Sequence, residues 1–211
     1  MLTGEVLAGI YLGRITRWDH PMIRALNPQI MLPPAEIVPL HRSDTSAATA
    51  VFTEFLSARS PDWRAHANSF SGPGAKGNDG VLKLLAQTKG SVAYLETSSL
   101  WVNKYILCAI QNSAGRFLKP SAETLTAAAQ GKTIPEDFRA SLIDSPDGYP
   151  ISSFTWLLVP EQGSEPSKRE AIKSFLKWTL TKGQTYPDAV GFAPLPKNLA
   201  ARVQAQISRI R

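Results

Sequence analysis

The stretch Pro39-Leu-His-Arg-Ser-Asp-Thr-Ser-Ala-Ala-Thr49 decides both the fold and the candidate site. An apolar alternating run, EIVPLH, ends at His41 and predicts a β-strand. Residues 46–58 (SAATAVFTEFLSA) predict a helix, because their larger apolar side chains recur at helical spacing and face inward; these are Val51, Phe52, Phe55 and Leu56. Only a short polar turn separates the two. The stretch therefore predicts a strand, a turn and a helix in direct succession.

The same alternation of strand and helix continues on both sides of this stretch. Apolar spacing and capping residues predict helices over 3–13, 16–28, 81–88, 121–130, 165–182 and 197–210, and further strands over 91–96, 105–110 and 149–160. The glycine-rich residues 69–80 predict a loop, and residues 135–146 predict irregular structure. Strands that alternate with helices indicate an α/β fold.

Composition excludes several classes of protein. The chain has 211 residues, 43% of them hydrophobic and 19% charged, which suits one large domain or two small lobes with a real core. No apolar run approaches the ~20 residues that span a bilayer. The first residues carry Glu5 and no basic start, so they do not predict a signal peptide. The single cysteine, Cys108, excludes an internal disulfide and a cysteine-rich metal site, and its apolar surroundings predict a buried, inert thiol.

The charge is basic but carries no nucleic-acid signature. Lys and Arg number 23 against 17 Asp and Glu, which gives +6 and a pI near 9.5. A mild basic concentration falls on residues 165–182, at the spacing of a solvated helix face. No zinc knuckle, aromatic ribonucleoprotein motif or arginine block accompanies it, so nucleic acid is not an expected partner. The five tryptophans are scattered, and packing in the core is their expected role.

The polar turn after the predicted strand is the main candidate for chemistry. It offers hydroxyl groups on Ser43, Thr45, Ser46 and Thr49, the guanidinium of Arg42, and the free amides of a helix start. Such a terminus attracts anions, and arginine adds a planar donor pair for a tetrahedral oxyanion. Asp44 either holds Arg42 or accepts a proton from hydrogen phosphate. The competing interpretation is that Ser43, Asp44 or Thr45 merely caps the helix.

A second candidate is GAKGNDG at 74–80, whose glycines allow close backbone approach. It lacks the spacing and the Lys-Ser/Thr ending of a nucleotide P-loop, and a surface loop is the plainer interpretation. Enzyme signatures are absent: His20, His41 and His66 have no metal-ligand spacing, and no G-x-S-x-G elbow occurs. These residues therefore indicate no catalytic site.

Motifs over nearly the whole chain resemble, in order, those of the phosphate-binding proteins of phosphate ABC transporters, which are periplasmic substrate-binding proteins of the type II fold. HRSDTSAATAVFTEFLS resembles that family's phosphate loop, R-S-D-G-S-G-T followed by an aromatic-rich helix. GAKGNDGV and GSVAYLE resemble its G-K-G-N-x-G-V and G-x-I-G-Y-V-E motifs. The opening LTGEVLAGIYLGRITRWDHPMIRALNP and the later YPISSFTWLLVP, FLKWTLTKGQTY and GFAPLP resemble its second-lobe start, hinge strand and closing helices.

The resemblance implies a two-lobed fold that holds an oxyanion by hydrogen bonds, without metal or cofactor. Residues 1–150 would form a nearly complete second lobe, and residues 151–211 the hinge strand and C-terminal helices of an incomplete first lobe. Arg42 matches the arginine that clasps phosphate, Asp44 the aspartate beside it, and Ser46 the serine that donates its hydroxyl and amide. The expected ligand-binding residues are Arg42, Ser43, Asp44, Ser46, Ala47 and Thr49.

The chain departs from the family pattern inside the phosphate loop. Thr45 and Ala47 stand where the family has glycine, and Ala48 stands where it has a ligand-binding threonine. Ala47 keeps an amide donor, and Thr49 lies one position after the family threonine. One lost hydroxyl donor to an anion costs on the order of 1–3 kcal/mol of binding free energy.

The family's N-terminal third, with its own ligand loops, has no counterpart in this sequence. The expected role is phosphate binding in an ABC-type uptake system, and the alternative is a shortened relative that has lost its ligand and acts as an interaction module or dimer. Expected partners are an oxyanion, a transporter permease, and either a second copy or a separately encoded first lobe. The family is exported, so the expected location is periplasmic or extracellular; without a signal peptide, a cytoplasmic location is the alternative.

The C-terminal segment is expected to need a covering surface. Phe154, Trp156, Leu157, Leu158 and the apolar face of the 165–182 helix would otherwise form a contiguous exposed patch, which soluble monomers rarely carry. The expected coverings are the second lobe itself, another copy, or a separate first lobe.

Overall fold

A three-stranded parallel sheet forms the centre of the first half of the protein. The computed structural model describes residues 1–66, 69–100, 105–162, 165–186 and 191–211. Strand β1 (Val38–Arg42) lies between β2 (Gly74–Ala75) and β3 (Ser91–Ala93), and both neighbours run parallel to it. His41 pairs with Gly74, and Val38 pairs with Ser91. The predicted α/β class is confirmed.

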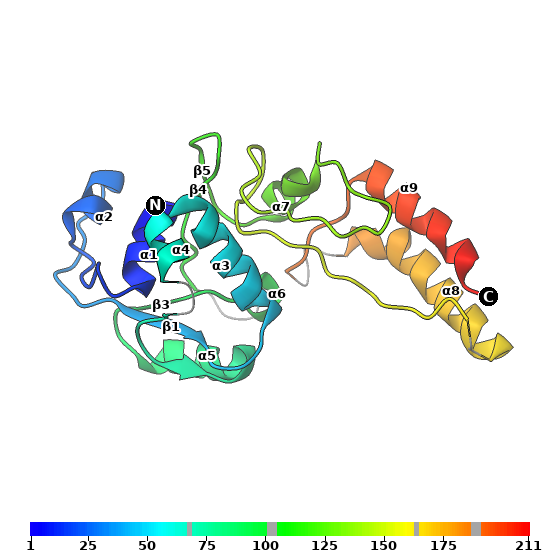
Figure 1. Cartoon of the computed structure of the whole chain (residues 1–211), viewed down its shortest axis with the longest axis horizontal. Coiled ribbons are helices and arrows are strands. Elements are labelled where there is room, and N and C mark those ends of the chain that lie inside the picture. Colours follow the sequence, from blue (N-terminus) through cyan, green and yellow to red (C-terminus); the bar gives the residue numbers. More distant parts are fainter. Residues whose placement is uncertain (67–68, 101–104, 163–164, 187–190) are drawn as a thin grey trace.

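Helices cover both faces of this sheet. Helices α1 (Gly4–Tyr11), α3 (Ala47–Arg59) and α4 (Pro61–Ala65) pack on one another over one face, and α5 (Gly77–Gln87) covers the other (Figure 1). The short helices α2 (Pro21–Leu26) and α6 (Thr97–Leu100) complete this half. The predicted Thr3 cap is confirmed, because its side chain accepts a hydrogen bond from the Val6 amide, and Gly13 turns the chain after α1 with a φ of 72°.

The core lies between α1, α3, α4 and the sheet. Tyr11, Phe55 and Trp63 are among its largest fully buried side chains. The Tyr11 hydroxyl donates to the carbonyl of Leu40 at 3.3 Å, which ties α1 to the central strand. Burial of this phenol raises its pKa well above the ordinary value. The inward face predicted for α3 is confirmed at Phe52, Phe55 and Leu56, while Val51 is half-buried.

The tryptophans divide into two groups. Trp63 is buried in the core and Trp18 packs partly against it, as expected. The expectation is wrong for Trp156 and Trp178, which are exposed on the C-terminal half. Trp101 lies outside the described residues.

Two predictions around the sheet need correction. The loop predicted over 69–80 contains β2 and the first turn of α5, because the glycine-rich backbone pairs with the edge of β1 despite having no hydrophobic period. The strand predicted over 105–110 is a strand only at its end: β4 (Ile110–Gln111) pairs antiparallel with β5 (Phe117–Leu118). Apolar alternation marks a strand, but a neighbouring backbone must be present for one to form.

The C-terminal half is mainly helical and extends away from the sheet. Helix α7 (Ala122–Ala129) is capped by Ser121 as predicted. Helix α8 (Pro166–Leu180) and helix α9 (Lys197–Gln206) lie side by side at the far end of the molecule (Figure 1). The 3₁₀ turns η1 (Lys182–Thr185) and η3 (Ile207–Arg209) follow α8 and α9 respectively.

The strand predicted over 149–160 is absent. The chain between α7 and α8 crosses the molecule as an irregular segment with no strand assigned over residues 151–160 (Figure 1). Several of its apolar side chains are exposed, and so are Phe175 and Trp178 on α8. None of the described helices is both long and apolar enough to cross a bilayer.

We expect Phe55→Ala to lower the free energy of unfolding by about 3–5 kcal/mol, because it empties a fully buried ring position between α1 and α3. Urea unfolding at neutral pH measures the change. Met31→Ala, at a side chain that is 97% exposed, is the control and should leave the unfolding curve unchanged. A loss below about 1 kcal/mol at Phe55 would contradict the assigned core.

Candidate functional site

Arg42 and Asp44 form a paired fork at the carboxyl end of β1. The Arg42 Nε donates to Asp44 Oδ1 and Nη2 donates to Oδ2, both at 2.7 Å. The arginine side chain is 11% exposed and the carboxylate 27%. The short turn places both groups on the same side of the chain, so the two parallel hydrogen bonds fix the plane of the guanidinium.

The second predicted loop meets this fork. Asn78 Oδ1 accepts from Arg42 Nη1 at 2.9 Å, and the Gly77 amide donates to Asp44 Oδ1 at 3.1 Å. The Ser43 amide donates to the carbonyl of Ala75 at 3.0 Å. β1 and β2 run parallel, so their carboxyl ends open at the same edge of the sheet and bring the two candidate segments together.

The start of α3 lies beside the fork. Ser46 is the N-cap, and its hydroxyl accepts from the Thr49 amide at 3.4 Å. The capping interpretation is therefore wrong in its residues, because the cap is Ser46 and not Ser43, Asp44 or Thr45. The Ala47 and Ala48 amides have no hydrogen-bond partners among the described residues. Both alanines line a large groove. Amides at a helix start with no intrahelical acceptor are ready donors for an anion.

The Thr49 hydroxyl already has a hydrogen-bond partner. Its hydroxyl lies 2.8 Å from that of Tyr94, which also accepts a hydrogen bond from the Arg42 amide at 3.2 Å. The Tyr94 ring stacks on Phe52 with centroids 4.3 Å apart, so the core fixes the hydroxyl position. Tyr94 thus joins β1 to α3 beneath the turn.

Asn78 and Tyr94 are site residues that lie outside the predicted ligand-binding set. Both lie inside quoted motifs, GAKGNDGV and GSVAYLE, so the signal that could find them was present. The sequence predicts Asn78 or Asp79 as a helix cap, which is wrong, because the N-cap of α5 is Lys76. Ser43 is exposed and its hydroxyl has no hydrogen-bond partner among the described residues. The structure therefore gathers Arg42, Asp44, Ser46 and Thr49 into one cluster and leaves the Ser43 side chain facing solvent.

The fork has electrostatic consequences. The hydrogen bonds from Arg42, and then the Gly77 amide, hold the pKa of Asp44 far below its usual range. The hydrogen bonds to Asp44 likewise raise the pKa of Arg42. Asp44 therefore stays ionised and acts as the support of Arg42, which favours the first of its two predicted roles. A guanidinium has five N–H donors, and Asp44 and Asn78 occupy three of them, so two remain for a ligand.

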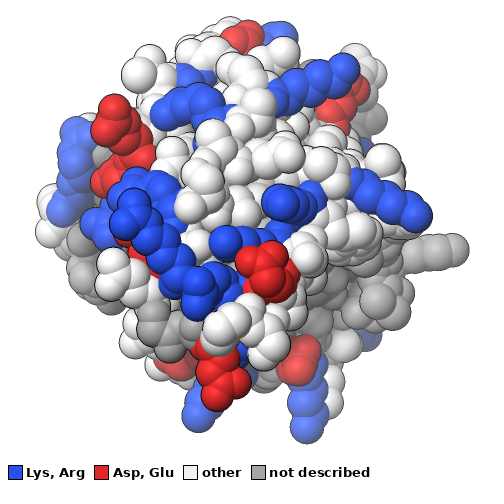
Figure 2. Space-filling model, turned by 90° about the vertical axis from the view of Figure 1, so that its right-hand side faces the viewer, with Lys and Arg blue, Asp and Glu red and all other residues white. Residues whose placement is uncertain are grey.

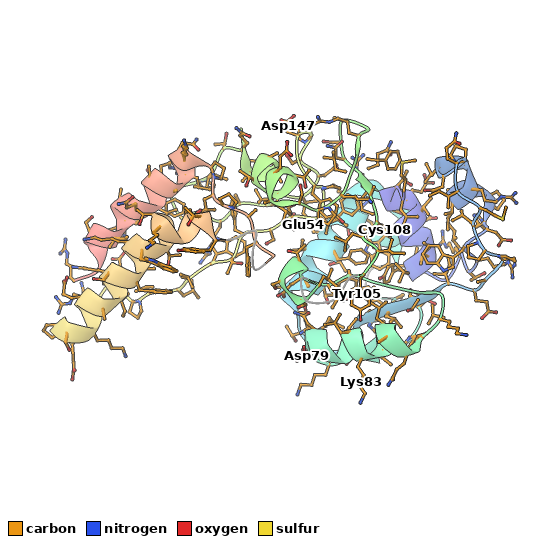
Figure 3. The ribbon with its side chains drawn as sticks, turned by 180° about the vertical axis from the view of Figure 1, so that it is seen from behind. Glu54, Asp79, Lys83, Tyr105, Cys108 and Asp147 are labelled. Atoms are coloured by element: carbon orange, nitrogen blue, oxygen red, sulfur yellow. The ribbon has the colours of Figure 1, made fainter. Side chains whose placement is uncertain are left out.

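Cys108, His20 and His66 lie away from the fork, whereas the Nδ1 of His41 lies 3.0 Å from the carbonyl oxygen of Arg42. Cys108 packs partly buried against the core (Figure 3), and burial raises its thiol pKa. His20 caps α2, and the His66 ring bonds the Asp62 carbonyl. The part of the chain that the structure describes holds no group of three His, Cys, Asp or Glu side chains able to bind a metal.

The arrangement is suited to holding a small tetrahedral anion. It combines a fixed guanidinium, a helix start with two unengaged amides and a cap hydroxyl, all at the carboxyl edge of a parallel sheet. These are hydrogen-bond donors of the kind that recognise oxyanions. The described residues bring no nucleophile paired with a base to this place.

Comparison with known proteins shows the family to which this chain is similar. The family model of a PBP superfamily domain matches residues 1–182. Curated relatives include the phosphate-binding protein PstS of Xylella fastidiosa (strain Temecula1), 35% identical over 97% of this chain and 59% of the relative. PstS of Methanocaldococcus jannaschii is 38% identical over 94% of this chain and 58% of the relative. The chain thus spans about three fifths of these relatives' length.

Solved structures share the fold. A periplasmic phosphate-binding protein called PfluDING, bound with phosphate, superposes with a TM-score of 0.69 at 20% identity, over 97% of this chain and 64% of that one. A DING protein superposes equally well, at 19% identity, over 97% of this chain and 66% of that one. At these identities the likeness establishes a PBP-like fold.

We expect Asp44→Asn to lower the free energy of unfolding at pH 7 and to remove part of its pH dependence. The native pKa of Asp44 is depressed, so its contribution is complete above the ordinary carboxyl pKa of about 3.9 and is lost as the pH falls below that value. Denaturant unfolding between pH 6 and pH 2.5 should show that the free energies of unfolding of the two proteins become more alike as the pH falls.

The control for this experiment is Asp79→Asn. Asp79 is exposed on α5 (Figure 3), and its carboxylate accepts no hydrogen bond from the described residues. Its pH profile should run parallel to that of the unmodified protein. If the free energy of unfolding of Asp44→Asn had the same pH dependence as that of the unmodified protein, the proposed support of Arg42 by Asp44 would be refuted.

Proposed function

The chain belongs to the PBP superfamily, and on that premise we propose that it binds inorganic phosphate or a related oxyanion as the substrate-binding component of an ABC-type phosphate uptake system. The observation that carries this proposal is the Arg42 guanidinium, held flat by Asp44 and Asn78 beside the open start of α3. Its curated relatives are named phosphate-binding proteins. Binding is by hydrogen bonds, with no metal or catalytic step.

Each predicted residue has a place in this binding scheme. Arg42 donates from its two unengaged N–H groups, Ser46 donates its hydroxyl and Ala47 its amide. Asp44 holds Arg42, and Thr49 supports the turn through Tyr94. Ser43 is the outermost donor, because its hydroxyl faces solvent. Hydrogen bonds from charged donors contribute about 1.5–3 kcal/mol each, so Arg42 is the main contributor.

The wider assignment follows the family resemblance. We assign residues 1–150 to the second lobe of a binding protein and residues 151–211 to the hinge and helices of a first lobe. A periplasmic or extracellular location and a transporter permease as partner belong to the same proposal.

The alternative function is an interaction module that has lost its ligand. Two observations favour it: Ala48 stands at the family's ligand-binding threonine, and the Thr49 hydroxyl is engaged with Tyr94. The large apolar groove beside α3 is a surface that such a module would use.

Calorimetric titration with phosphate distinguishes the two functions. We expect saturable one-site heat from the 211-residue chain and none from Arg42→Ala at the same concentrations, because the variant loses the only guanidinium of the described cluster. Arg24→Ala, at an exposed arginine on α2, is the matched control and should bind as the unmodified chain does. No heat from a folded, unmodified chain would contradict the proposed function.

Ala48→Thr tests the phosphate loop by adding a hydrogen-bond donor instead of removing one. Restoring a hydroxyl at the first turn of α3 adds one donor to a charged ligand, so we expect phosphate affinity to rise roughly 10- to 100-fold, equivalent to about 1.4–2.8 kcal/mol. Ala50→Thr, on the same helix but beyond its first turn, is the control and should have no effect. An unchanged affinity in Ala48→Thr would place the ligand elsewhere.

A further inference from the structure

Tyr94 lies at the same edge of the sheet as the candidate site. It follows β3 directly, and Ala93, the residue before it, pairs with Leu40 of β1. β1 and β3 run parallel, so their carboxyl ends open at one edge, where Arg42 also lies. Tyr94 is half-buried, and its ring is held by stacking on Phe52. The third strand of the sheet thus brings a fixed hydroxyl group to the site.

The Tyr94 hydroxyl oxygen has two neighbours that can donate to it. The Arg42 amide, which can only donate, lies 3.2 Å away, and the Thr49 hydroxyl lies 2.8 Å away. The two hydroxyl groups have two protons between them, and the hydrogen bond that joins them uses one. The other proton is left for a further acceptor, and none of the described residues supplies one.

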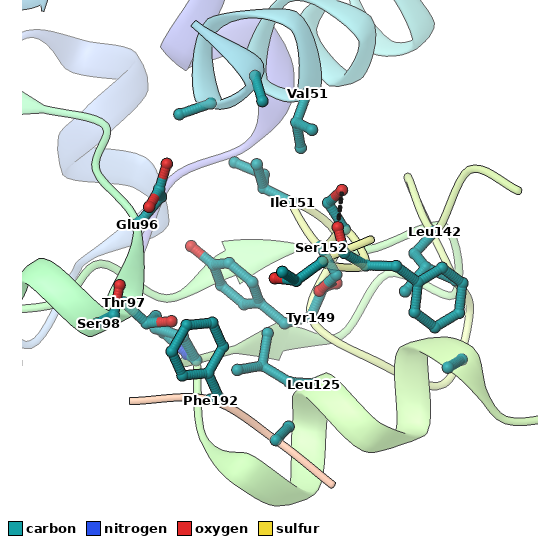
Figure 4. A pocket seen from close by; sticks show the side chains of 18 of the residues that line it. Val51, Glu96, Thr97, Ser98, Leu125, Leu142, Tyr149, Ile151, Ser152 and Phe192 are labelled. Atoms are coloured by element: carbon teal, nitrogen blue, oxygen red, sulfur yellow. Dashed lines mark hydrogen bonds between the residues drawn. The ribbon is translucent and has the colours of Figure 1, made fainter. Parts of the chain in front are cut away.

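The groove indicates which hydroxyl keeps the free proton. Tyr94 lines the groove together with the first two residues of α3, whereas Thr49 does not. Figure 4 shows this groove between α3, at Val51, and Glu96, which is two positions after Tyr94. Thr49 is half-buried, so a free proton on its hydroxyl would lack an acceptor, which is costly. The favoured arrangement has Thr49 donating to Tyr94 and leaves the Tyr94 proton for the groove.

We infer that Tyr94 is a further binding residue for the oxyanion, whose hydroxyl donates to the ligand and offsets part of the hydroxyl lost at Ala48. This inference rests on the proposed function and adds a donor to the same site. Arg42 and Thr49 both donate to the Tyr94 oxygen, and a hydroxyl that accepts hydrogen bonds becomes a stronger donor. Thr49 is then a positioning residue, because it acts on the ligand through Tyr94.

The local charge makes a neutral donor important at this place. Arg42 is the only cation of the described cluster, and Asp44 neutralises it, while Glu96 lines the same groove. The basic excess lies on residues 161–211, which hold nine Lys and Arg against four Asp and Glu, or +5 of the total +6. Figure 2, which looks onto that end of the molecule, shows Lys and Arg gathered around an uncharged area. An oxyanion at the start of α3 therefore depends on directed donors such as the Tyr94 hydroxyl.

Calorimetric titration of Tyr94→Phe with phosphate tests the inference. The variant keeps the ring on Phe52 and loses only the hydroxyl, so we expect the affinity to fall roughly 10- to 100-fold, the effect of one donor to a charged ligand. Tyr186→Phe, at a ring that is 50% exposed after η1, is the matched control and should bind as the unmodified chain does. An unchanged affinity in folded Tyr94→Phe would overturn the inference.

Variants at Thr49 separate the donor from its support. Thr49→Val removes the hydrogen bond that polarises Tyr94 but leaves the Tyr94 proton, so we expect a smaller loss of affinity, roughly 2- to 5-fold. Thr49→Ser keeps the hydroxyl and should bind as the unmodified chain does. Thr53→Val is the control, because that hydroxyl donates to carbonyls of its own helix. A loss in Thr49→Val as large as that in Tyr94→Phe would place the ligand on Thr49 and overturn the inference.

A second measurement decides the matter if Tyr94→Phe does not fold. In the unmodified chain with labelled tyrosine ζ-carbons, NMR should show that saturating phosphate slows the exchange of one tyrosine hydroxyl proton with water at least 10-fold, because the anion binds this proton. Thr49→Val should shift the same resonance without phosphate, since Thr49 contacts no other tyrosine hydroxyl among the described residues. No slowed hydroxyl in the phosphate-bound chain would overturn the inference.

The failure of this inference is distinguishable from the failure of the proposed function. Phosphate heat from the unmodified chain, with the same affinity in Tyr94→Phe, overturns the role of Tyr94 and leaves the proposed function intact. No heat from the folded, unmodified chain contradicts the proposed function and overturns this inference with it.

Discussion

The parallel pairing of β1 with β2 is the constraint on which the candidate site depends. β2 has only two residues, yet its register against His41 and Arg42 brings the glycine-rich loop to the edge where the Arg42 turn begins. The Arg42–Asp44 fork, the Asn78 contact and the Gly77 amide all follow from that register. A shift of one residue would turn the Arg42 side chain to the opposite face of the sheet.

The site is built mainly from hydrogen-bond donors with little net charge. Asp44 neutralises Arg42, and Glu96 lies close enough to raise the pKa of Arg42 further. The proposed recognition of an oxyanion therefore depends on the direction of the donors more than on an excess of positive charge. The basic excess of the protein lies elsewhere, over residues 161–211.

The two halves of the molecule differ in how fully they bury their apolar side chains. The half around β1 buries Tyr11, Phe55 and Trp63 completely, whereas α8 has no buried residue. The groove between them is lined by Ala47 and Ala48 at the start of α3 and by Phe175 and Trp178 on α8. The candidate oxyanion site therefore opens into the same groove as the exposed rings of α8.

The sequence by itself determined the α/β class, most of the helices and the Arg42–Thr49 turn. These features depend on local spacing: apolar residues repeat every three or four positions in α3, and Ser46 caps the same helix that follows the strand. The quoted motifs also identified the family, since they run in order along the chain.

Only the tertiary structure decided which groups meet and which strands form. Asn78 and Tyr94 reach Arg42 across 36 and 52 positions of sequence, a contact that no local pattern specifies. The apolar run at 149–160 has the composition of a strand, but a strand is a pairing between two backbones, and none of the described residues offers the second one. Local propensity depends on the segment alone, whereas hydrogen-bonded pairing also depends on which backbone lies beside the segment.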